Sequence, residues 1–142
     1  MSDQSKTVTA AVIVIGDEIL SGRTKDQNLG FLAENLNETG IQVCECRVVA
    51  DVEAEIVAAV NDLRARFDYV FTTGGIGPTH DDITADSIGA AFGLKVDHNP
   101  EAVAILEAHY AHTGAELNQA RMRMARTPAG AALVEKPVSK AP

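Results

Sequence analysis

The hydrophobic residues of this chain form two patterns that alternate along the sequence. Three runs, Val8–Ile15, Ile41–Val49 and Tyr69–Thr73, are rich in apolar and β-branched residues, and the first is nearly continuous, as in a strand buried on both faces of a parallel sheet. Between them, apolar residues recur at helical spacing, namely Leu29, Leu32, Ala33 and Leu36, and then Ile56, Val60, Leu63 and Phe67. This order predicts an α/β fold of βαβ units, with helices on both faces of the sheet.

The second half of the chain predicts shorter elements. A helix is expected over residues 85–92 and a short edge strand over 94–96. Asn99 followed by Pro100 is a strong helix start, and this helix is expected to run to His112. Another helix over 116–126 and a last strand over 132–134 complete the expected elements.

Composition and charge narrow the function classes. The 20 Asp and Glu residues outnumber the 12 Lys and Arg residues, and the net charge of -8 argues against a nucleic-acid-binding face. The longest apolar stretch, Ala10–Ile15, is far shorter than the roughly 20 residues of a membrane span. The first residues carry no signal-peptide pattern, so a cytoplasmic protein is expected. The two cysteines, Cys44 and Cys46, are expected to be small buried residues on one face of a strand.

The loop after the third predicted strand carries the most distinctive chemistry. Gly74, Gly75 and Gly77 leave the backbone free to expose N–H groups to an anion, and a helix N-terminus follows. Asp81 and Asp82 would repel a bare anion, unless a divalent metal ion bridges carboxylate and phosphate. The alternative is an ordinary turn, because Gly-Gly and Gly-Pro are common turn dipeptides.

Loops after the other two strands should reach the same edge of the sheet, since ligands of open parallel sheets bind beyond the carboxyl ends of the strands. Arg23 and Lys25 could hold a phosphate there or be solvated. Asp51 is expected either to cap the next helix or to line the site, and Thr84 is a candidate cap for the helix after the glycine loop. The basic run 121–126 is expected to be a subunit contact or a solvated face.

Four segments together resemble a known family. In this order, they are similar to the molybdopterin-binding domain of the MoaB/Mog type, in the form found as the amino-terminal domain of CinA proteins. The segments are GDEILSG, TKDQN, VVADVEAEI and DYVFTTGGIGPTHDDIT. The resemblance covers Thr7–Pro142 and implies one domain over residues 1–142, ordered from about residue 7, with a three-layer α/β/α sandwich and a mostly parallel sheet. It also implies a homo-oligomer, most often a trimer, that acts on a small pterin or nucleotide and neither on nucleic acid nor at a membrane.

The resemblance also implies which residues act. Asp82 and Asp51 would be catalytic, and Asp82 and Asp81 would hold Mg²⁺ or another divalent metal ion. The residues expected to bind molybdopterin or an adenine nucleotide are Gly16, Asp17, Glu18, Ser21, Asp26, Asn28, Gly74, Gly75, Gly77, Pro78, Thr79 and Thr84. Three functions stay open, namely metal-assisted adenylylation of molybdopterin, hydrolysis of ADP-ribose or a related dinucleotide, and binding without catalysis. Two departures bear on them: Ser139 replaces the family's usual glycine, and the chain reaches Pro142 without the further strand that members normally have.

Overall fold

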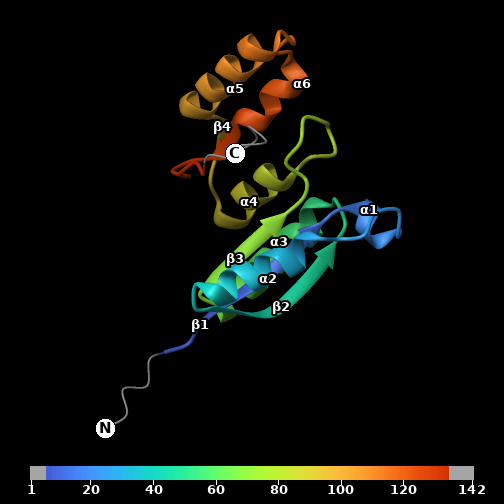
Figure 1. The fold of residues 1–142 in the computed structure, drawn as a ribbon, viewed down its shortest axis with the longest axis vertical. Helices are drawn as coiled ribbons and strands as arrows, with labels where there is room; N and C mark the ends of the chain where they lie inside the picture. Colours follow the sequence, from blue (N-terminus) through green and yellow to red (C-terminus); the bar gives the residue numbers. More distant parts are fainter. Residues whose placement is uncertain (1–5, 135–142) are drawn as a thin grey trace.

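The computed structural model describes residues 6–134, in which a parallel sheet carries helices on both faces (Figure 1). Strands β1 (Val8–Ile15), β2 (Ile41–Val49) and β3 (Tyr69–Thr73) lie in the order β2-β1-β3, and both pairings are parallel. The helices of this part are α1 (Asp17–Leu20), α2 (Asn28–Glu38), α3 (Glu53–Arg66) and α4 (Thr84–Phe92). The predicted α/β class is confirmed, and the single-turn helix α1 is an element that the sequence did not predict.

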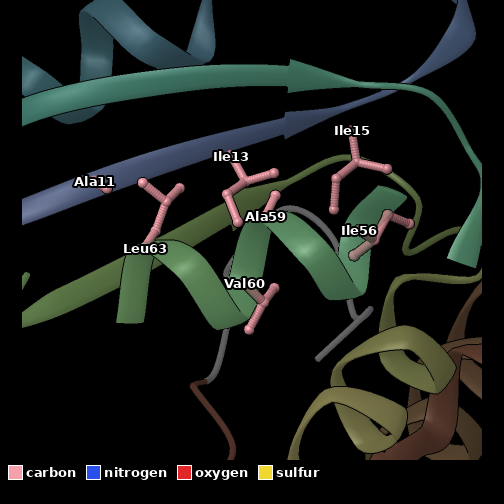
Figure 2. Close-up of a cluster of buried hydrophobic side chains, with 7 residues drawn as sticks. All are labelled: Ala11, Ile13, Ile15, Ile56, Ala59, Val60 and Leu63. Atoms are coloured by element: carbon pink, nitrogen blue, oxygen red, sulfur yellow. The ribbon is translucent and has the colours of Figure 1, made fainter. Parts of the chain in front are cut away.

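The central strand β1 supplies the core of the sheet, because residues 10–15 are buried. Successive side chains of a strand point to opposite faces, and Figure 2 shows Ala11, Ile13 and Ile15 directed toward α3. There they pack against Ile56, Ala59, Val60 and Leu63. Helix α2 covers the opposite face, next to β2 and β1 (Figure 1). The strand of continuous hydrophobicity therefore lies where the sequence predicts it, between two layers of helix.

A smaller unit, residues 96–128, follows α4 and is called the 96–128 module below. It contains β4 (Val96–His98), α5 (Pro100–Thr113), α6 (Gln119–Met122), the 3-10 turn η1 (Arg123–Ala125) and β5 (Arg126–Pro128). Strands β4 and β5 pair antiparallel, and the module has its own buried cluster of Ala102, Leu106 and Ala125. Helix α4 lies between the sheet and the module and contacts α3 on one side and β5 on the other (Figure 1).

The end of the described chain differs from the sequence-based expectation. The last strand is β5 and not 132–134, because backbone bonds from Asn99 to the carbonyl of Ala125 (2.8 Å) and from Ala129 to that of Lys95 (2.8 Å) hold 126–128 against β4. The expected helix over 116–126 is short, since Asn118 caps it and the chain tightens into η1 after Met122. The distinctive Ser139 lies outside the described residues.

A bulge in β2 overturns the expectation for the cysteines. Val43 pairs with Ala10 and Glu45 with Ala11, so Cys44 is an extra residue in the strand. As a result Cys44 is exposed and Cys46 is half-buried, and neither is a core residue. None of the helices in residues 6–134 is long and apolar enough to cross a membrane.

Candidate functional site

The carboxyl ends of β1, β2 and β3 bring three predicted site segments together. The N–H of Gly16 donates to the carbonyl of Val49 at 3.0 Å, which joins the ends of β1 and β2. Beyond this point Asp17 and Asp51 bind each other reciprocally, because each backbone N–H donates to the other's carboxylate at 3.1 Å. Asp51 therefore does not cap α3, whose N-cap is Val52 without a side-chain bond. Its carboxylate instead fixes the turn after β1.

The chain after β3 turns sharply against β1 through two left-handed glycines. Gly74 has φ +88° and Gly75 has φ +66°, conformations that side-chain-bearing residues rarely adopt. A Cβ at Gly74 would overlap the carbonyl oxygen of Ile15, so only glycine allows this approach. Thr84 holds the turn from the other side: its Oγ1 donates to the carbonyl of Gly74 at 2.8 Å and its N–H to that of Gly75 at 3.1 Å. Thr84 is thus the first residue of α4 and not its N-cap, which is Ile83.

The rest of the loop is organised by Asp82. Its Oδ2 accepts hydrogen bonds from the N–H of Thr79 at 2.9 Å and from the Oγ1 of Thr79 at 2.7 Å. A Cβ at Gly77 would lie only 2.8 Å from the same oxygen, so a glycine lets the carboxylate come close. Asp81 is exposed and faces His80 at 3.1 Å. The loop therefore holds Asp82 in a fixed orientation and leaves Asp81 at its surface.

Carboxylates accumulate at this edge of the sheet. Burial raises the pKa of Asp51; the hydrogen bond from Asp17 opposes the rise, and the charges of Asp17, Glu18 and Asp82 add to it. A carboxyl with a raised pKa among like charges is typical of functional sites. Within residues 6–134, however, no three His, Cys, Asp or Glu side chains converge as a ready-made metal site. A Mg²⁺ ion held by one or two carboxylates together with ligand oxygens fits this donor set.

Two cavities lie on either side of the glycine turn. The first, about 400 Å³, is lined by Gly74, Thr73 and loop residues that include the predicted Glu18, Asp26 and Asn28. Asp26, which precedes the N-cap Gln27 of α2, accepts from the N–H of Asn28 at 3.2 Å and from that of Leu29 at 2.9 Å. The Oγ1 of Thr73 is buried and has no hydrogen-bond partner in the described part of the chain. A buried hydroxyl without a partner is unfavourable, which makes Thr73 a candidate ligand contact that the sequence did not suggest.

The second cavity, about 210 Å³, lies between the glycine loop, α4 and the 96–128 module. Four of the residues that line it were predicted from the sequence as site residues, namely Gly75, Gly77, Asp82 and Thr84. The predicted ligand residues that line neither cavity are Gly16, Asp17, Ser21, Pro78 and Thr79, and the predicted catalytic residue Asp51 lines neither. Of the two cations expected near the site, Lys25 lines the first cavity, whereas Arg23 donates to Ser21 at 3.2 Å.

Two arginines of the second cavity were not predicted from the sequence as site residues. Arg126 binds Asp86 of α4 through both carboxylate oxygens, at 2.9 Å and 3.0 Å, and Arg123 donates to the backbone carbonyl of Asp82 at 3.4 Å. The expected solvated face of the 121–126 run is therefore wrong for these two residues. The one indication in the sequence that Arg123 and Arg126 face the same cavity is their spacing of three residues, which puts both side chains on one side of a helical turn.

These features define a class: an α/β domain with a glycine-rich loop and clustered carboxylates at the carboxyl end of a parallel sheet. The chain belongs to the family described as "Probable molybdopterin binding domain", whose model matches residues 11–140. A CinA-like protein of Sulfurihydrogenibium sp. is 35% identical over 132 residues, which are 93% of this chain and 33% of that protein. Relatives from Caldivirga maquilingensis and Pyrobaculum calidifontis are each 40% identical, and the chain spans about half of their length, 52% and 51% respectively.

Solved structures agree with this assignment. The structure of the protein CinA from Thermoplasma acidophilum, described as of unknown function, has a TM-score of 0.86 at 34% identity, and the match covers 96% of this chain and 80% of that one. The tungsten cofactor synthesizing protein MoaB from Pyrococcus furiosus has a TM-score of 0.57 at 26% identity, over 78% of this chain and 67% of that one. The resemblance to MoaB/Mog and CinA proteins and the predicted fold are thus confirmed.

The raised pKa of Asp51 has a consequence for stability. A carboxyl whose pKa is higher in the folded than in the unfolded state costs folding free energy once pH rises above both values. We expect Asp51→Asn to raise the free energy of unfolding at pH 7, by less than about 1 kcal/mol because the site is partly solvated. The amide oxygen can still accept from Asp17, so the turn is kept.

Urea unfolding at a series of pH values measures this difference. The gain over wild type should shrink as pH falls through the pKa of folded Asp51, where the wild-type carboxyl takes up its proton and the charge repulsion ends. A gain that stays constant down to pH 3 would mean that Asp51 carries no electrostatic cost.

Proposed function

We propose that this domain binds molybdopterin or an adenine nucleotide by its phosphate at the Gly74–Thr84 loop, and carries out metal-assisted nucleotidyl or phosphoryl chemistry there. The observation that carries the proposal is the pair of left-handed glycines packed against Ile15, at the edge where the charge of Asp82 contributes to the raised pKa of Asp51. A loop of this kind presents backbone N–H groups to an anion, in front of the N-terminus of α4. Membership of the molybdopterin-binding family supports the ligand class.

Asp51 and Asp82 are the residues that would hold a Mg²⁺ ion together with the ligand's phosphate oxygens. When bound, such an ion neutralises negative charge that develops on a transferring phosphoryl group. Thr79 prepares Asp82 for this role by holding Oδ2 with two hydrogen bonds, and Asp17 holds Asp51 by its N–H. Asp81 would contribute only from the exposed rim of the loop, where it faces His80.

Other residues of this chain would position the ligand. Thr84 fixes the carbonyls of Gly74 and Gly75, so the loop keeps its shape before the ligand arrives. The free hydroxyl of Thr73 is available to a polar group in the first cavity, next to Glu18 and Asn28. In this arrangement the protein supplies orientation and a fixed electrostatic environment, which are the main protein contributions to phosphoryl transfer.

A second candidate is hydrolysis of the pyrophosphate of ADP-ribose or a related dinucleotide. The greater similarity to the CinA structure than to MoaB, with TM-scores of 0.86 and 0.57, favours this branch of the family. A third candidate is binding of the same ligands without catalysis. For each of these three candidate functions we propose that the protein is a cytoplasmic homotrimer.

Product analysis separates these functions. The protein is incubated with Mg²⁺ and either ADP-ribose or ATP plus molybdopterin, and the products are separated by chromatography. AMP from ADP-ribose indicates hydrolysis, and adenylylated molybdopterin indicates transfer. Ligand binding by calorimetry without either product would establish a binding module, and the absence of both binding and products would overturn the proposal.

A further inference from the structure

The side chain of Arg123 lies in the wall of the second cavity with most of its hydrogen-bonding capacity unused. Its Nη2 donates to the backbone carbonyl of Asp82 at 3.4 Å, which is long for such a bond. Its Nε is buried and has no hydrogen-bond partner among the described residues. Leaving a buried donor of a charged group without an acceptor is costly, and a bound ligand can supply the missing acceptor.

The charge of Arg123 is also uncompensated, in contrast to that of Arg126. Arg126 is neutralised by both carboxylate oxygens of Asp86. The nearest loop acid, Asp82, gives Arg123 only its backbone carbonyl, while its Oδ2 accepts from Thr79. No ion pair within residues 6–134 includes Arg123. A positive charge therefore stands beside a loop built to receive an anion.

Packing on both sides fixes the position of this arginine. Arg123 begins the η1 turn, whose Ala125 is buried and accepts from the N–H of Asn99 at 2.8 Å. Three residues further on, the Arg126 pair with Asp86 ties the same segment to α4. The guanidinium is thus held at the cavity by the fold of the 96–128 module, without help from a ligand.

We infer that Arg123 binds the phosphate of the ligand from the 96–128 module, across the second cavity from Gly75 and Gly77. The inference rests on the proposed function and adds to it that the anion is held from two sides. The chemical class of the bound group is a phosphate ester or pyrophosphate, because the planar guanidinium donates two parallel hydrogen bonds to such oxygens. Apolar neighbours in the cavity, among them Ile88, Met124 and Leu133, lower the local dielectric and strengthen the contact.

Calorimetric titration with ADP-ribose and with inorganic pyrophosphate, both with Mg²⁺, tests this inference on wild type, Arg123→Gln and Arg123→Lys. Arg121→Gln is the matched control, because Arg121 stacks on Tyr110 at 4.9 Å and does not line the second cavity. We expect Arg123→Gln to weaken binding of both probes roughly 10-fold or more, and the control to bind as wild type does. The affinity of Arg123→Lys should lie between these two, since lysine keeps the positive charge but lacks the two parallel N–H donors of the guanidinium.

The outcomes separate the two proposals. If wild type binds and the Arg123 variants bind equally well, the inference is overturned while the proposed function stands. If wild type binds neither of the two probes nor molybdopterin, both are overturned; if it binds molybdopterin alone, the same variants are compared with that ligand. Thermal melting shows whether each variant folds; should Arg123→Gln not fold, the ¹⁵Nε resonance of Arg123 in wild type decides, and a signal that pyrophosphate leaves unshifted counts against the inference.

Discussion

Gly74→Ala is expected to destabilise the fold by about 3 kcal/mol or more. A residue with a side chain at φ +88° costs roughly 1–3 kcal/mol in backbone strain. In addition, the new Cβ would overlap the carbonyl oxygen of Ile15, a rigid backbone atom at the end of the central strand, so β1 and β3 must move apart. The measurement is the free energy of unfolding from urea denaturation.

Gly22→Ala is the matched control for this change. Gly22 has a similar left-handed φ of +78°, but a Cβ there meets nothing within 4 Å. It should therefore show the strain alone, roughly 1–2 kcal/mol. Equal losses in the two variants would mean that the close approach of Gly74 to Ile15 contributes nothing to stability.

Asp82→Asn is expected to lower metal-dependent turnover roughly 100-fold or more while the protein stays folded. The amide oxygen can still accept from the N–H of Thr79, so the loop keeps its shape. The substitution removes the negative charge that would hold Mg²⁺ beside the phosphate. The transition state would then lose several kcal/mol of charge stabilisation, which corresponds to a rate roughly 100-fold lower or more. The measurement is the rate of AMP or adenylyl product formation across a Mg²⁺ titration.

Asp97→Asn controls for the loss of one carboxylate. Asp97 is exposed on β4, faces Lys95 and His98, and lines neither of the two cavities beside the glycine turn. This variant should turn over as wild type does. Full activity of Asp82→Asn at every Mg²⁺ concentration would contradict the role proposed for Asp82.

The sheet and its glycine loop could be predicted because their signals are local. Ala10–Ile15 is buried on both faces, so its pattern needs no knowledge of its partners. Gly74 and Gly75 are predictable for a similar reason, since few residues other than glycine tolerate their conformation. The position of these residues after a buried strand was then enough to place the loop at the carboxyl end of the sheet.

Other features depend on contacts between distant residues, and the sequence could not show them. Asp51 binds Asp17 across 34 positions, so its resemblance to a helix cap was misleading. Arg123 reaches the carbonyl of Asp82 across 41 positions, and a run of arginines looks solvated until the 96–128 module is placed. The bulge at Cys44 has no signature in the residues of β2 alone, because it is defined by the register against β1.

The two separate hydrophobic clusters give the molecule two units of unequal local stability. The cluster under the sheet buries seven residues and that of the 96–128 module three, so the module should open locally at a lower free energy than the sheet. Amides of α5 would then exchange with solvent through openings that leave β1 intact. A ligand held by both units would be coupled to this opening by mass action, and its binding would slow exchange in α5.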